Sequence, residues 1–305
     1  MIANFFNKTK PVTTFSIAFL LFIYYFTVSI TDNSLEITVI FLLKRGIFFL
    51  LLILFLLIVK FIIDKNRLTK DNSYALLLVV LLLGSFSEAF FSYQIVFSNL
   101  ILLLSFRKVY SLRSDINTKM KLFDAAFWVG ISTLIYAWSI FYMLLIYVGI
   151  LMYQKLSLKN LLIPLIGFLT PVFIYFTYCF YIDETLYFYN RFSLNTNFEV
   201  YNSLKFLVPI IFLVIMLVWS IVIVTPRIVL VSNKLKSSWS VLINHLLISF
   251  IVVILAPIKN GAELLFTIVP STIIITNFVQ GIKSKIIKNV LLYLFLIISV
   301  SVYFL

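Results

Sequence analysis

The chain has very little cysteine, histidine and charge. Its 305 residues include one Cys, one His and 11 acidic residues, and charged residues of both signs make up 11%. The single Cys179 excludes an internal disulfide and a thiolate-based metal site. The single His245 excludes a bis-histidine haem site within one chain. Soluble domains carry about 25% charged residues, so a chain this poor in charge is not an ordinary soluble domain.

Apolar sequence is abundant instead. Hydrophobic residues make up 63% of the chain, and the mean hydropathy is +1.14. Uncharged stretches recur, each near the roughly 17 to 25 residues that a helix needs to cross a bilayer; they are 13–30, 160–182, 206–226, 237–258, 264–282 and 289–305. We therefore predict an all-α, polytopic transmembrane bundle. It forms a single integral membrane domain over residues 1–305, with no separate soluble domain.

The formal net charge of +13 has a simple explanation in such a protein. Nucleic-acid binding needs basic residues gathered on a water-facing patch, whereas here they lie at the ends of the apolar stretches. Cytoplasmic loops of membrane proteins are enriched in Lys and Arg. We therefore predict the lipid bilayer as partner and no nucleic acid.

Two apolar stretches are too long for one crossing. Residues 74–106 and 125–154 number 33 and 30, and as straight helices they would be roughly 45 to 50 Å long. If each is a hairpin of two short helices, turning near Glu88–Tyr93 and near Ala137–Ser139, 19 of the 24 basic residues lie on one side. Single spans give 14 to 10. The pattern therefore predicts about eleven membrane segments, with the N-terminus inside and the C-terminus outside.

Three carboxylates are candidate catalytic residues on the outer face: Asp32, Glu36 and Glu88. The sequence 31–43 predicts a short interfacial helix that ends at Lys44-Arg45. A carboxylate there could deprotonate a hydroxyl acceptor. The alternative, favoured for Asp32 and Glu36, is a helix cap with an acidic first turn. For Glu88 an exposed turn residue is as good an interpretation as a functional one.

Four cations are candidates for binding a phosphate or substrate: Arg45, Arg191, Lys205 and Lys259. Arg191 lies in the aromatic-rich loop 183–203, whose rings could stack on sugars or lipid head groups, although an interfacial aromatic belt is the favoured interpretation. His245 lies within an apolar stretch, where an interhelical hydrogen bond is favoured over a proton relay. The sequence predicts no metal site, and it leaves open which cofactor, if any, the protein uses.

Two resemblances extend these expectations. The segments MIANFFNKTKP, FSNLILLLSFRKVYSLRS and KLFDAAFWVGISTLIYAWSIFYMLLIYVGILMYQKLSLKNLLIPLIGFLTP resemble an integral membrane family of Bacteroidota across essentially the whole chain. That resemblance implies a multi-pass protein of the bacterial inner membrane and no particular activity.

The second resemblance concerns the order of helices in the middle of the chain. A short helix pair, a basic turn, another pair, a Lys-bearing turn and a Pro-containing span are similar to membrane glycosyltransferases of the GT-C class. These use polyprenyl-phosphate sugars and carry an acidic residue after the first span, the position of Asp32, with Glu36 as second candidate. The loop lacks an adjacent acidic pair.

Three functions remain open at this point. The first is a cell-envelope glycosyltransferase, or a protein that handles a polyprenyl-phosphate-linked sugar, acting at the outer face. The second is a non-enzymatic subunit or scaffold that binds other membrane subunits in an envelope assembly or secretion complex. The third is a transporter of lipid or small solutes, for which the apolar stretches offer few polar groups besides Asn244 and His245.

Overall fold

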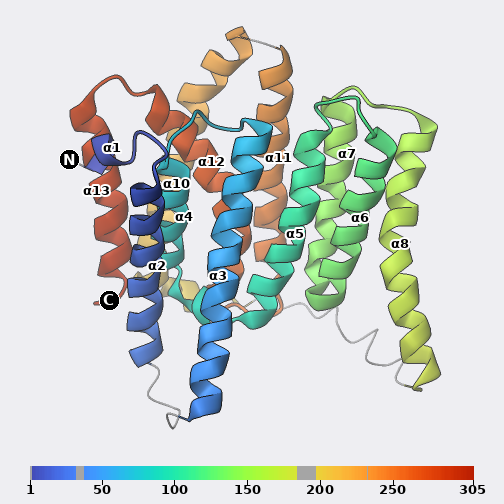
Figure 1. Cartoon of the computed structure of the whole chain (residues 1–305), viewed down its shortest axis with the longest axis horizontal. Coiled ribbons are helices and arrows are strands. Elements are labelled where there is room, and N and C mark those ends of the chain that lie inside the picture. The colour runs from blue at the N-terminus through green and yellow to red at the C-terminus, as the bar shows by residue number, and fades with distance from the viewer. Residues whose placement is uncertain (1, 32–37, 184–196, 232) are drawn as a thin grey trace. The chain divides into compact units, whose positions relative to one another are not determined.

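The computed structural model describes residues 2–31, 38–183, 197–231 and 233–305, and every regular element within these ranges is helical (Figure 1). The prediction of an all-α fold is thus confirmed for the part that the structure describes. The helices of the first half are α1 (Ile2–Phe5), α2 (Pro11–Thr31), α3 (Val39–Asn66), α4 (Tyr74–Ser85), η1 (Ser87–Phe91), α5 (Tyr93–Ser111), α6 (Thr118–Ile135), η2 (Ala137–Phe141) and α7 (Tyr142–Met152).

The second half continues with longer helices and two further short 3-10 helices. They are α8 (Leu158–Tyr181), η3 (Glu199–Asn202), α10 (Leu204–Val231), α11 (Asn233–Ile254), η4 (Ala262–Leu264), α12 (Leu265–Gly281) and α13 (Lys285–Ser301). Hydroxyl side chains cap several of these helices. Ser157 accepts a hydrogen bond from the Asn160 amide at the start of α8, for example. Such caps satisfy amides that have no partner inside the helix.

Six apolar segments in the described ranges are long enough to cross a membrane as helices: Pro11–Ile30, Val39–Asn66, Leu158–Tyr181, Leu204–Ile228, Leu235–Ile254 and Ala262–Gly281. This architecture fits a multi-pass membrane protein. The segments Tyr74–Ser85 and Ala137–Met152 are equally apolar but shorter. The count of about eleven membrane segments and the orientation of the termini stay predictions.

Both long apolar stretches are broken where the sequence predicts a turn. In the first, α4 ends at Ser85, η1 follows, and α5 begins at Tyr93. In the second, Tyr136 adopts an extended backbone (φ −132°, ψ 102°) that ends α6, and η2 leads into α7. Figure 1 shows α6 and α7 side by side and antiparallel. Neither stretch is therefore one straight helix.

The predicted interfacial helix ending at Lys44-Arg45 is wrong. Both residues lie inside α3, which begins at Val39 and runs on to Asn66. Thr38 caps this helix by accepting a hydrogen bond from the Phe41 amide at 3.2 Å. The apolar sequence continues beyond Arg45 for a membrane-spanning length, and its backbone groups need partners inside the helix, so two cations near the start of the helix do not end it.

The chain forms two compact units, each assembled from separate segments. The first contains 1–96, 198–224 and 260–305, and the second contains 97–197 and 225–259. The single integral membrane domain therefore stays a prediction. In the first unit α4 is buried along its whole length and packs against α2, α3, α12 and α13. The core of this unit is the pair α4 and α12.

The second unit is organised around α6. It packs most extensively against α8, and α7 packs against α11. The close approach of α6 and α8 depends on two glycines, because a Cβ on Gly130 would lie 2.7 Å from the Phe168 carbonyl oxygen and one on Gly167 would lie 2.6 Å from that of Phe123. Backbones approach this closely in membranes where residues are small.

Candidate functional site

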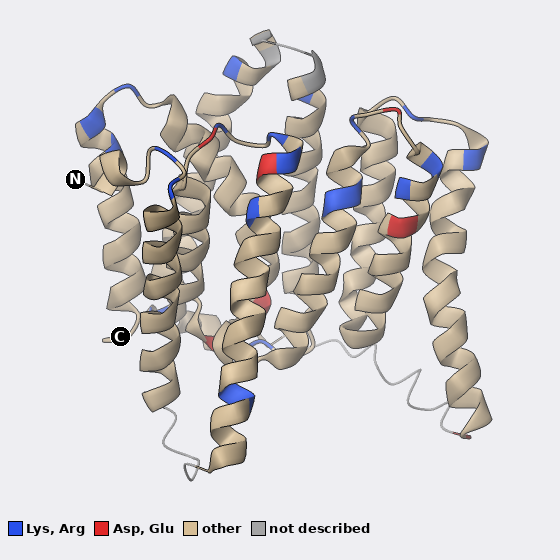
Figure 2. Ribbon diagram, in the orientation of Figure 1, with Lys and Arg blue, Asp and Glu red and all other residues tan. Residues whose placement is uncertain are grey.

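Within each unit, basic residues gather at one end of the helices, as Figure 2 shows. In the first unit that end includes the start of the chain and the connections after α3 and α12. Thr9 hydrogen-bonds Asp71 there, and the Lys70 amide donates to Gln280. The described basic residues at this end are Lys8, Lys10, Lys60, Lys65, Arg67, Lys70, Lys283, Lys285 and Lys288.

The opposite end of the first unit brings three of its short 3-10 helices together. η1 packs against η4, and η3 lies just before α10. The described charged residues at this end are Lys44, Arg45, Glu88, Glu199, Lys205 and Glu263. Three described cations and three described carboxylates thus balance each other here, whereas Lys and Arg outnumber Asp64 and Asp71 at the basic end.

Glu88 and Lys205 form an ion pair at this end. The Lys205 Nζ donates to Glu88 Oε1 at 2.5 Å, joining η1 to the first turn of α10. The two side chains are 25% and 35% exposed respectively, so both are reachable from outside the protein. Lys205 also lies 5.5 Å from the ring centroid of Phe206. One predicted carboxylate and one predicted cation are thus in contact.

Glu263 lies in η4, the element packed against the Glu88 turn, and its side chain is fully buried. Its Oε1 accepts the hydroxyl hydrogen of Tyr201, and its Oε2 accepts the Gly261 amide at 2.9 Å. A buried carboxylate is tolerated only when such partners replace water. Glu263 therefore fastens η3 to η4 and shapes the surroundings of the Glu88 pair.

The backbone of Gly261 adopts a conformation that the turn before η4 requires. Its φ is +94°, a left-handed conformation that glycine adopts without strain. A Cβ at this position would lie 2.3 Å from Phe206 Cε1. The Phe206 ring, next to Lys205 in sequence, therefore packs directly on this turn.

Arg45 lies on the same end of the first unit. Its guanidinium carbon is 5.1 Å from the ring centroid of Phe91 in η1 and 5.2 Å from that of Phe41. Tyr25 donates a hydrogen bond to the Arg45 carbonyl at 2.9 Å. Arg45 therefore contacts the same short helix as the Glu88 pair, through an aromatic ring.

Lys259 is placed differently. It belongs to the second unit, is 5% exposed, and donates hydrogen bonds to the carbonyls of Ile254 at 2.7 Å and Ala256 at 3.1 Å. These carbonyls lie at the end of α11, where helix carbonyls need external donors. A cation there also stabilises the helix dipole. The observed contacts of Lys259 are those of a helix cap.

Three predicted site residues, Asp32, Glu36 and Arg191, lie outside the described residues. Their roles stay predictions. Glu263 was not among the candidates selected from the sequence, and neither was its partner Tyr201. The available signal was the Asn260-Gly261 turn directly before a charged residue and an apolar helix.

His245 occupies the interior of the second unit. Its Nδ1 is 2.8 Å from the Tyr110 hydroxyl on α5, and its ring centroid is 4.1 Å from that of Phe106. The favoured interpretation, an interhelical hydrogen bond, is confirmed. Within the described ranges no three His, Cys, Asp or Glu side chains are grouped to hold a metal ion.

The Glu88 cluster, which comprises Glu88, Lys205 and the neighbouring Arg45 and Glu263, can perform two kinds of chemistry. A partly exposed carboxylate can accept a proton, and the ammonium beside it can stabilise a negative oxygen. Glu263 lacks that access because it is buried and bonded. Comparison with protein-family models, curated proteins and solved structures finds no significant match to this chain.

Proposed function

We propose that the chain is an inner-membrane protein of bacterial cell-envelope biogenesis that transfers a sugar from a polyprenyl phosphate at the outer face. Glu88 is the general base and Lys205 binds the phosphate. One observation carries this proposal: the reachable ion pair between Glu88 and Lys205, held on short turns at the end of the first unit that mixes charges of both signs. The resemblance to the Bacteroidota family agrees with the inner-membrane location, and the helix order similar to GT-C enzymes agrees with the activity.

The proposed reaction needs one base and one cation. Glu88 removes the proton from an acceptor hydroxyl, whose oxygen attacks the anomeric carbon of the sugar. The bond from that carbon to the phosphate oxygen breaks, and its electron pair leaves with the polyprenyl phosphate. Lys205 stabilises the charge that develops on the departing phosphate. Asp32 or Glu36, which directly follow the first apolar segment, remain proposed contributors to the same site.

The ion pair must open before substrate binds. Partly exposed pairs contribute only about 0 to 1 kcal/mol because water competes for both partners. Substrate phosphate can therefore replace Glu88 as the partner of Lys205 at little energetic cost. Glu263 and Tyr201 keep η4 and η3 in place while this exchange occurs, since the hydrogen bond from the Gly261 amide is buried and the one from Tyr201 is partly buried.

The central test is Glu88→Gln in a strain that lacks the native gene. Removing a general base lowers the rate by about 10² to 10⁴, so polyprenyl-phosphate sugar should accumulate and the envelope glycan should decrease, at an unchanged protein level. Glu199→Gln is the matched control, because Glu199 is an exposed carboxylate at the same end. Normal glycans in both the deletion strain and the Glu88→Gln strain would refute the transferase.

A charge exchange separates chemistry from structure. The double variant Glu88→Lys, Lys205→Glu keeps an ion pair between η1 and α10 but reverses the two positions. A transferase should stay inactive in this variant, whereas a scaffold that needs only the ion pair between η1 and α10 should recover its function. Restored envelope assembly in the double variant would therefore favour the non-enzymatic membrane subunit over the enzyme.

The proposed orientation is N-terminus inside and C-terminus outside. It follows from the positive-inside rule applied to the basic ends of the helices. We expect single cysteines at Ser111 and Ser237 to be protected from a membrane-impermeant thiol reagent in intact spheroplasts, and one at Leu305 to react. Cys179 is replaced by Ala in this background. Labelling of Ser111→Cys from outside would overturn the orientation.

A further inference from the structure

A cleft of about 380 Å³ lies between α5 and α6 in the second unit. From α5 it is lined by Leu104, Arg107 and Lys108. Arg107 and Lys108 follow Leu104 by three and four positions, which places them on the same helix face as Leu104. From α6 it is lined by Phe123, Asp124, Phe127 and Trp128. None of these residues belongs to the Glu88 cluster, and the cleft lies at the basic end of its helices.

The lining divides into a charged part and an aromatic part. Lys108 Nζ lies 2.5 Å from Asp124 Oδ2 across the cleft. The aromatic part comes from α6, where Phe123 and Phe127 stack with ring centroids 6.2 Å apart and Phe127 meets Trp128 edge to face at 5.6 Å. A ligand with a charged head and an apolar body matches this arrangement.

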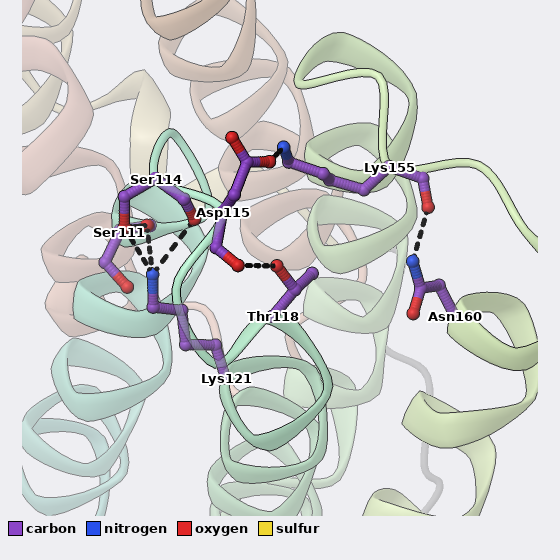
Figure 3. A network of polar contacts seen from close by, with 7 residues as sticks. All are labelled: Ser111, Ser114, Asp115, Thr118, Lys121, Lys155 and Asn160. Atoms are coloured by element: carbon purple, nitrogen blue, oxygen red, sulfur yellow. Dashed lines mark hydrogen bonds and ion pairs between the residues drawn. The ribbon is translucent and has the colours of Figure 1, made fainter.

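The loop that joins α5 to α6 is braced by a network of polar contacts (Figure 3). Lys121 Nζ donates to the Ser111 carbonyl at 2.7 Å and to the Ser114 hydroxyl at 2.7 Å. Lys155 forms an ion pair with Asp115, and Asn160 donates to the Lys155 carbonyl at 2.6 Å. These contacts hold the ends of α5 and α6 on the charged side of the cleft.

The charge of the cleft points to the ligand. Arg107 and Lys108 are positive and Asp124 is negative, so the lining carries a net single positive charge. A phosphodiester carries a single negative charge, and a guanidinium forms a fork that binds phosphate oxygens. Basic pockets between transmembrane helices bind lipid head groups in this way. We propose that this cleft binds the phosphodiester of phosphatidylglycerol, with an acyl chain along Phe127 and Trp128.

The three aromatic rings of α6 favour a lipid as the source of the phosphate over a free phosphate ion. An inorganic phosphate ion would use the two cations and make no use of the apolar surface that the three rings present to the cleft. Interfacial Trp and aromatic side chains commonly lie at the head-group level of a bilayer. A lipid satisfies both parts of the cleft at once.

The test uses the full chain purified in a neutral detergent, with Trp138, Trp219 and Trp239 replaced by Phe so that Trp128 is the one fluorescent tryptophan. Phosphatidylglycerol brominated on its acyl chains is the quencher. Arg107→Gln, Lys108→Gln together should weaken binding about tenfold or more. Lys119→Gln, Lys159→Gln is the matched control: both lysines are exposed in the same unit and lie outside the cleft lining. The control should bind within about twofold of the native protein.

Asp124→Asn provides a test in which lipid binding should become tighter rather than weaker. Removing this carboxylate raises the net charge of the cleft and releases Lys108, so phosphatidylglycerol should bind a few-fold more tightly. A purely structural pair would give lower stability and unchanged binding. Protection of the buried Cys179 from a thiol reagent reports whether each variant is folded.

Two further probes identify the ligand class. Brominated phosphatidylcholine should quench Trp128 less than the glycerol lipid at equal concentration, and inorganic phosphate should not displace the lipid. Equal quenching by both lipids, or binding that is unchanged in the Arg107, Lys108 variant, would overturn the proposal. Displacement by inorganic phosphate at the lipid's own concentration would overturn it in favour of a free-phosphate site.

Discussion

The two 3-10 turns that break the long apolar stretches solve the same problem with different polar groups. Both η1 and η2 contain five residues. At η2, Ser139 hydrogen-bonds Ser98 at 3.1 Å, and Ser98 hydrogen-bonds Ser132 at 2.7 Å, all fully buried. At η1, Glu88 pairs with Lys205, 117 positions along the chain, and both stay partly exposed.

The difference between the two turns shows that the Glu88–Lys205 ion pair at η1 is not needed to break the helix. The turn at η2 ends one helix and starts another with neutral hydroxyls alone, because serine oxygens are sufficient partners for one another in a buried site. An ion pair is therefore not required to break an apolar helix. Its partial exposure at η1 agrees with a role in binding, and this is why the proposed site is placed there.

The largest expected effect concerns the support of the charged turn. Gly261→Ala forces a side chain into a left-handed conformation, which disfavours the folded state by about 1 to 2 kcal/mol, and drives a Cβ to 2.3 Å from Phe206. Overpacking adds roughly 1 to 3 kcal/mol. We expect a clear fall in the thermal unfolding temperature of the detergent-solubilised protein.

The matched control for that prediction is Gly46→Ala. A Cβ at Gly46 meets nothing within 4 Å, and the residue lies inside α3. Alanine should leave the unfolding temperature equal or slightly higher, since it favours helix by about 1 kcal/mol over glycine. Equal unfolding temperatures for both variants would show that the Gly261 turn does not limit stability.

A smaller effect is expected at the neutral turn. Ser98→Ala leaves the hydroxyl of Ser139 buried with a partner removed, at a cost of about 1 to 3 kcal/mol. Replacing Ser98, Ser132 and Ser139 together by alanine removes every member and should cost less than the single change. The rate at which heating exposes Cys179, buried in the same unit, measures both. A triple variant that is less stable than the single one would contradict this.

The sequence was sufficient for features that local composition determines. Helices follow from apolar stretches of membrane-spanning length, and the break at residues 137–139 follows from a stretch too long for one crossing combined with the distribution of basic residues. The end of the predicted interfacial helix failed for a physical reason. An apolar run of membrane-spanning length follows Arg45, and where water is excluded its backbone amides and carbonyls must pair within the helix, so α3 runs straight through Lys44 and Arg45.

The residues Glu88 and Lys205 of the candidate site could be predicted from the sequence, but their contact with each other could not. Glu88 is recognisable as a charge within a long apolar stretch and Lys205 as a charge just before another, but their contact is a tertiary one across 117 positions. Charge patterning is local and says nothing of which distant partner a residue meets. The burial of Glu263 was missed for the same reason, because its hydrogen-bond partner Tyr201 lies 62 positions away.

The smallest expected effect on stability is at the charged turn, where the effect on function should be largest. Glu88→Gln and Lys205→Gln each remove one charge of a pair that is 25% and 35% exposed. Water and salt screen such pairs, so a double-mutant cycle should give a coupling free energy below about 1 kcal/mol. Thermal unfolding of the wild type, both single variants and the double variant in the same detergent measures it. A coupling well above that range would mean that the pair is a structural tie like the serines at η2, and the case for a substrate-exchangeable ion pair would be lost.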